Sequence, residues 1–143
     1  GDITQEIKGV LTIDNLNPED RVLIAEACSH HPIEDDIGRS KLPKWLSEYL
    51  GFNVRWDSCA GRDYPENFQS YKLIIHCGAC MITRYEMLNR IDQAIKAGVA
   101  ITNYGICISY LKGVLERVIA PIPGAIDLFN GYKKELKYGV KRN

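Results

Sequence analysis

The sequence lacks the features of a membrane protein and of a strongly charged binding protein. None of its apolar runs approaches the roughly 20 residues that a transmembrane helix requires, and no signal-peptide pattern opens the chain. Lys plus Arg and Asp plus Glu both number 18, so the formal net charge is zero. A nucleic-acid or membrane-surface binder would be expected to carry a basic excess. We therefore expect a cytoplasmic protein that binds neither nucleic acids nor membranes.

The chain also lacks the even number of cysteines that a complete set of disulfide bonds requires. It has five, and an odd number fits poorly with a disulfide framework. In a reducing compartment, such cysteines are more often buried, metal-binding or catalytic. One of them, Cys107, falls inside an expected helix, where a thiol most simply packs in the core. The chain of 143 residues is otherwise ordinary, with 45% hydrophobic residues, and is long enough for one domain with a sizeable core.

Apolar runs of strand length alternate along the chain with segments of helical periodicity. We expect strands at 21–27, 52–57, 71–76 and 99–103, and helices at 40–50, 84–98 and 106–119. In the second helix, Leu88, Ile91 and Ile95 form the expected apolar stripe. Alternating strands and helices predict an α/β fold: a Rossmann-like parallel sheet of about four strands flanked by helices and joined by right-handed crossovers.

Both ends of the chain differ from this pattern. We expect residues 1–20 to be a linker from a preceding domain, because they start with Gly rather than Met and contain no strong element. The α/β domain itself is expected at 21–125. Residues 126–143 are basic, and we expect them to form a solvated C-terminal tail.

The cysteines follow the predicted strands. Cys28 comes directly after the first strand, Cys77 and Cys80 follow the third, and Cys59 follows the second. In open parallel sheets, ligands bind outside the carboxyl ends of the strands, where the connecting loops meet. The sequence therefore predicts a metal site at the C-terminal edge of the sheet.

The complete pattern is Cys28-x-His30 followed, after 45 intervening residues, by His76-Cys77-x-x-Cys80. Three chemistries are compatible with it. The first is a structural zinc site, in which Cys28, His30, Cys77 and Cys80 form a closed Cys3His tetrahedron. The second is an iron–sulfur cluster held by three thiolates, with one iron open to exchange. The third, a redox dithiol of Cys77 and Cys80, leaves the Cys28-x-His30 pair unexplained. Spacing alone favours zinc and iron–sulfur equally.

These motifs resemble a known family. Cys28-Ser29-His30 and His76-Cys77-Gly78-Ala79-Cys80 are similar to the cluster motif of the [FeFe]-hydrogenase maturation GTPase (HydF) family. The stretches EACSHHPIEDDIG, HCGACM and ITNYG resemble that family too, and the likeness covers about residues 20–120. The resemblance implies that this chain is similar to the C-terminal iron–sulfur cluster-binding domain of the family.

The resemblance also implies a function. Cys28, Cys77 and Cys80 would be the thiolate ligands of a [4Fe–4S] cluster, and His30 and His76 would be the fourth ligand or its neighbours. The domain would be a scaffold and carrier for the diiron subcluster precursor, which is its transient cargo. Its partners would be radical-SAM maturases and apo-[FeFe]-hydrogenase, and the full-length protein would be a homo-oligomer. No G-x-x-x-x-G-K-[ST] phosphate loop occurs in the chain, so we expect no GTPase or other enzyme activity from this chain.

Overall fold

The computed structural model describes residues 2–26, 41–60, 65–76 and 84–139. Four strands form its sheet: β1 (Arg21–Glu26), β2 (Arg55–Ala60), β3 (Leu73–His76) and β4 (Ala100–Asn103). Their order in space is β2-β1-β3-β4, and every neighbouring pair is parallel. The predicted fold class is therefore confirmed: a four-stranded parallel sheet flanked by helices.

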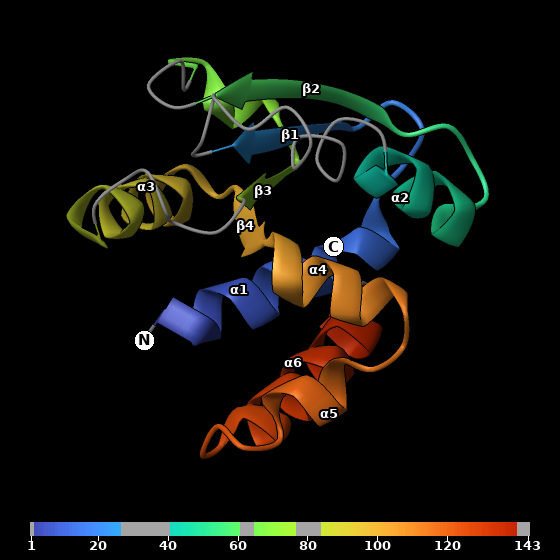
Figure 1. Cartoon of the computed structure of the whole chain (residues 1–143), viewed down its shortest axis with the longest axis vertical. Helices are drawn as coiled ribbons and strands as arrows, with labels where there is room; N and C mark the ends of the chain where they lie inside the picture. Colours follow the sequence, from blue (N-terminus) through green and yellow to red (C-terminus); the bar gives the residue numbers. More distant parts are fainter. Residues whose placement is uncertain (1, 27–40, 61–64, 77–83, 140–143) are drawn as a thin grey trace.

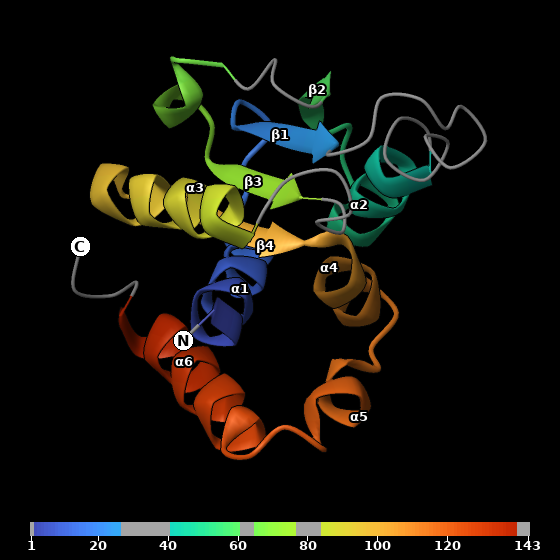
Figure 2. The ribbon, with the colours of Figure 1, turned by 60° about the vertical axis from the view of Figure 1, so that its left-hand side comes forward.

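Helices lie on both sides of the sheet (Figures 1 and 2). They are α1 (Asp2–Val10), α2 (Leu42–Leu50), α3 (Arg84–Ala97), α4 (Tyr104–Leu111), α5 (Leu115–Ile119) and α6 (Ala125–Gly139), with short 3-10 turns η1 (Leu11–Asn15) and η3 (Phe68–Ser70). Two expected boundaries were wrong. The helix expected at 106–119 is two helices, because the chain turns at Gly113, whose φ is 74°. The strand expected at 52–57 is β2 at 55–60, because residues 52–54 first pass along α2, where the Val54 amide donates a 3.0 Å hydrogen bond to the Ser47 hydroxyl. Within the described residues, no helix is long and apolar enough to cross a membrane.

Both terminal segments contribute to the core. Residues 1–20, expected to be a linker, contain α1 and η1, in which Ile7, Val10, Leu11 and Ile13 are fully or almost fully buried. The first three lie at i, i+3 and i+4, which is the spacing of one helical face. Most of the expected tail is α6, in which Phe129 is buried. The domain core thus reaches well beyond residues 21–125.

The two faces of the sheet are covered unequally. On one face, α1, α2 and α4 share a core cluster with Val22, Ile24, Leu73 and Ile75, and α5 and α6 pack behind them, on α4 and on α1 and η1. On the other face, α3 packs through Ile91 and Ala94 onto a smaller cluster that contains Leu23, Ala25, Ile74 and Ile101. The strands are buried on both faces, which explains why they appear in the sequence as continuous apolar runs.

The two edges of the sheet also differ. Helix α1 lies along β4, and the buried Thr102 hydroxyl donates a hydrogen bond to the Glu6 carbonyl at 2.9 Å. The other edge is β2, where Asp57 pairs with Arg21 and accepts a 2.8 Å hydrogen bond from Tyr71. Charged side chains on an edge strand discourage pairing with another strand. One edge is therefore covered by a helix, and the other carries charged side chains.

Candidate metal centre

The topology of the sheet defines a switch point between β1 and β3. From β1 the chain passes through α2, on one face, to β2; from β3 it passes through α3, on the other face, to β4. The two connections leave in opposite directions, yet β1 and β3 are neighbours in the sheet. In open α/β sheets, ligands bind in the crevice that opens at the carboxyl ends of two such strands. The carboxyl ends of β1 and β3 therefore border the site that this fold favours.

The predicted ligands belong to the segments that follow these two strands. Cys28 and His30 come after β1, and Cys77 and Cys80 come after β3; all four lie outside the described residues. The structure does describe the two strand ends from which these segments start. Strand β1 ends at Glu26 and β3 at His76, and Ala25 is in register with His76.

His76 is the one predicted ligand that the structure describes. It is 2% exposed at the last position of β3. Burial, and secondarily the positive charge of Arg90, lower the pKa of His76 to about 3. The imidazole is therefore neutral at physiological pH. Neutral imidazole is the form that binds metal ions, so His76 fits the role of a ligand or of a hydrogen-bonding neighbour to one.

One row of in-register residues crosses the sheet next to the carboxyl edge: Cys59, Ala25, His76 and Asn103. Paired residues in parallel strands project to the same face, and Ala25 belongs to the cluster under α3. Cys59 lies within β2, not after it as expected, because β2 starts later than predicted. It is partly buried and packs against the same cluster.

The end of β4 leads directly into α4. The Asn103 side chain accepts a 2.8 Å hydrogen bond from the Ile106 amide and so caps the helix. The first turn of α4 therefore starts beside His76, because Asn103 is its partner on β4. This turn places further backbone amides near the carboxyl edge of the sheet.

Cys107 is a core residue, as predicted. Its side chain is completely buried in α4, and burial raises the pKa of its thiol to about 12. A protonated thiol is a poor metal ligand. Among the described residues, no group of three or more His, Cys, Asp or Glu side chains is placed to hold a metal ion. The other predicted ligands, Cys28, His30, Cys77 and Cys80, fall in the gaps between the described segments.

Sequence reasoning missed Arg90. This residue is 8% exposed in α3, and its charge acts on His76. It lies next to Ile91 and four residues before Ala94, both of which face the sheet. Helical periodicity could therefore have placed it at the boundary of the buried face. A buried guanidinium carries a positive charge, so it favours anionic groups nearby.

Comparison with known proteins identifies the family. A family model described as the hydrogen maturase F tetramerization domain matches residues 4–121. By this description, the matched family is an oligomerization domain of a hydrogen maturase. No individual curated protein matches the chain. Because the matched range covers most of the 143 residues, the chain belongs to the HydF family of hydrogenase maturation proteins.

Proposed function

We propose that this chain is a [4Fe–4S]-binding scaffold domain, which carries the diiron subcluster precursor and delivers it to apo-[FeFe]-hydrogenase. One observation carries the proposal. Strands β1 and β3, whose following segments contain Cys28 and the Cys77/Cys80 pair, are neighbours at the switch point of the sheet. Membership of a hydrogenase maturation family supplies the biological setting.

In this proposal, Cys28, Cys77 and Cys80 are the thiolate ligands, and His76 or His30 is the fourth ligand or its neighbour. A cluster held by three thiolates offers one iron at which the cargo, or a ligand on the cargo, can bind. The chain itself has two further contributions. It keeps His76 neutral and buried, and it places the guanidinium of Arg90 close enough to affect that imidazole. Both suit a site that holds an anionic cluster.

The match to a tetramerization domain also supports self-association. We propose that this chain forms part of a homo-oligomer. Radical-SAM maturases, which would supply the precursor, and apo-hydrogenase, which would receive it, are the proposed partners. In this scheme the domain is the scaffold on which the precursor is assembled from the parts that the maturases supply, and the carrier that delivers it.

Anaerobic reconstitution with iron and sulfide tests the cluster. We expect close to four irons per chain and an EPR signal on reduction, which added imidazole or cyanide perturbs. Cys28→Ser and Cys77→Ser should each abolish cluster binding and hydrogenase maturation. Cys59→Ser is the matched control and should retain full iron content, because Cys59 is separated from β3 by β1.

The alternatives have different outcomes in the same experiment. About one zinc, no uptake of iron, and unfolding on chelation would identify a structural Cys3His site. A dithiol of Cys77 and Cys80 would show a lowered thiol pKa at one of them and would not depend on Cys28. Full iron content in both Cys28→Ser and Cys77→Ser would refute the proposal.

A further inference from the structure

Helix α3 has an apolar strip on its solvent side. Tyr85 is 79% exposed, Leu88 37% and Ile95 47%. Their spacing places them on one side of the helix, next to the face on which Ile91 and Ala94 contact the sheet. The sequence pattern had grouped Leu88 and Ile95 with the buried stripe, and the structure shows that they lie outside it. A helix that only covers a sheet needs no such second apolar strip.

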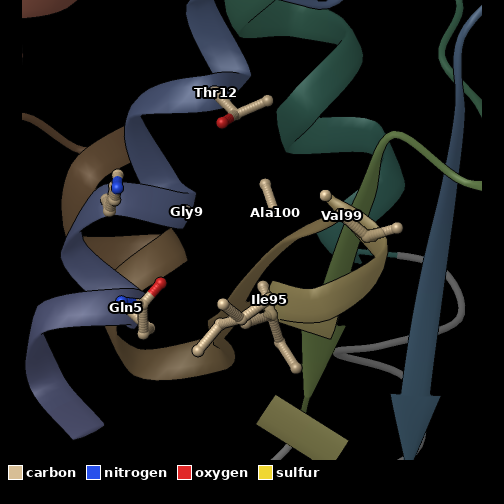
Figure 3. Close-up of a pocket in the computed structure, with 9 residues that line it drawn as sticks. Gln5, Gly9, Thr12, Ile95, Val99 and Ala100 are labelled. Atoms are coloured by element: carbon tan, nitrogen blue, oxygen red, sulfur yellow. The ribbon is translucent and has the colours of Figure 1, made fainter. Parts of the chain in front are cut away.

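The strip adjoins a groove between α3 and α1. Ile95 is also part of the wall of a hollow of about 250 Å³, which Val99, Ala100 and Ile101 complete on the sheet side. In Figure 3, Gln5, Gly9 and Thr12 border this hollow on the α1 side, and Ile95 and Val99 border it on the other. A second hollow of about 410 Å³, which extends toward Tyr71, shares part of its wall. The sheet side of the first hollow is apolar, whereas its α1 side carries the polar side chains of Gln5, Lys8 and Thr12, and Gly9 contributes only backbone.

We propose that the α3 strip and this groove together form an interface with a second copy of this chain. In a two-fold arrangement, the strip of each copy lies against the groove of the other. Such a contact needs a surface that carries both complementary parts, and here they are adjacent on one face of the molecule. The inference rests on the proposed oligomer and specifies its surface. Both parts fall inside the range 4–121 that matches the tetramerization model.

The charges around this surface are complementary. Asp92 lies on the exposed side of α3 between Leu88 and Ile95, and 56% of its side chain is exposed. Lys8, also exposed, lines the groove on the α1 side. Within one copy, Asp92 pairs with Lys96, and the Lys8 ammonium lies over the Tyr132 ring. Across a two-fold axis, Asp92 of each copy can approach Lys8 of the other, which would set the register of the contact.

Sedimentation velocity of the whole protein over a range of concentrations tests this interface. Leu88→Glu and Ile95→Glu should each weaken self-association at least about tenfold and so lower the average mass, because each places a charge in the apolar contact. Val118→Glu is the matched control. Val118 is 49% exposed on α5, away from the strip and the groove, so its substitution should leave the mass unchanged. Circular dichroism verifies that each variant is folded.

A charge exchange tests the geometry independently of the apolar contacts. Asp92→Lys alone and Lys8→Asp alone should each weaken association, and the double variant should restore it. An oligomer whose mass is the same in wild type, Leu88→Glu and Ile95→Glu would overturn this interface while leaving self-association intact. A wild type that stays monomeric at every concentration would overturn both this interface and the proposed oligomer. Weakening by Val118→Glu but not by the α3 variants would place the contact on α5.

Discussion

Gly9 of α1 lies directly against the main chain of Ile101 in β4. A Cβ atom added to Gly9 would lie 2.0 Å from the Ile101 carbonyl oxygen and 2.6 Å from its carbonyl carbon. Backbone atoms of a strand that is hydrogen-bonded into a sheet cannot move aside as a flexible side chain can. The close approach lets α1 cover the edge of the sheet, and a glycine is therefore required at this position.

Gly9→Ala should accordingly destabilise the fold. We expect the free energy of unfolding to fall by about 3 kcal/mol or more, since α1 must move away from β4 and lose contacts of Ile7 and Val10. Gly131→Ala is the matched control, because it lies in α6 with no atom within 4 Å of an added Cβ. There the substitution should raise stability by about 0.5–1 kcal/mol through the helix propensity of alanine. Urea unfolding measures the change in the free energy of unfolding for both variants. Equal changes in Gly9→Ala and Gly131→Ala would contradict the close approach of Gly9 to Ile101.

Much of this fold could be predicted from the local pattern of apolar residues in the sequence. Strands β1 and β3 show how far this pattern reaches, and α3 shows where it stops. Continuous runs such as VLIA and LIIH predicted strands buried on both faces, and the structure places them at the centre of the sheet. Along α3, however, helical periodicity predicted an apolar stripe of Leu88, Ile91 and Ile95 but could not predict which of these residues contact the sheet. Ile91 is buried and Ile95 is half exposed because α1 stops short of covering α3. That outcome depends on the position of a helix far away in the sequence.

The candidate site was predictable to a similar extent. Strand ends in an α/β sheet converge, so it could be inferred that the strand ends preceding Cys28 and Cys77 lie at the same edge of the sheet. The order β2-β1-β3-β4, which makes β1 and β3 direct neighbours, could not. Neither could the burial of His76, since this depends on α3 and on the charge of Arg90. The sequence predicts which residue types are candidate ligands, whereas tertiary packing determines the protonation state of His76.

The lowered pKa of His76 predicts a pH-dependent stability. Its pKa is about 3 in the folded protein and about 6.5 when unfolded. The unfolded chain therefore binds more protons between these values, and stability is lost as the pH falls through 6.5 toward 3. This group alone should lower the free energy of unfolding by about 2 kcal/mol between about pH 8 and pH 5. Urea titrations of metal-free protein measure the slope.

His76→Gln is the control for this prediction, because glutamine is of similar size and does not titrate. The difference in slope between wild type and His76→Gln isolates His76 from the carboxylates and the other histidines. Equal slopes in the two proteins would mean that His76 takes up its proton in the folded state at an ordinary pKa. The direction of the shift would then be contradicted.

A carboxylate joins two helices through tyrosines. Asp14 of η1 accepts hydrogen bonds from Tyr49 of α2, at 2.7 Å, and from Tyr110 of α4. Burial, followed by the bond to Asp14, raises the pKa of both phenols, so both remain protonated donors at neutral pH. Asp14→Ala should lower the free energy of unfolding by about 2 kcal/mol, because two donors lose their acceptor.

The two tyrosines provide an internal comparison. Tyr110→Phe should cost more stability than Tyr49→Phe, because Tyr49 is 43% exposed and its hydroxyl can turn to water. In the double variant Asp14→Ala/Tyr110→Phe, the loss should be smaller than the sum of the single losses. Additive losses would show that the bond between Asp14 and Tyr110 contributes nothing to stability.

Buried and partly exposed thiols should differ in reactivity. Cys107 is 0% exposed with a pKa of about 12, whereas Cys59 is only partly buried on the edge strand β2. Alkylation requires an accessible thiolate, so Cys107 should react only through global unfolding, roughly a thousandfold or more slowly than it does in denaturant. A native-state iodoacetamide pulse with peptide mass spectrometry measures both sites at once. In denaturant, the two should react alike. Equal labelling of Cys59 and Cys107 in the native protein would instead mean that α4 opens independently of the core, and that Cys107 is not the packing residue that its burial indicates.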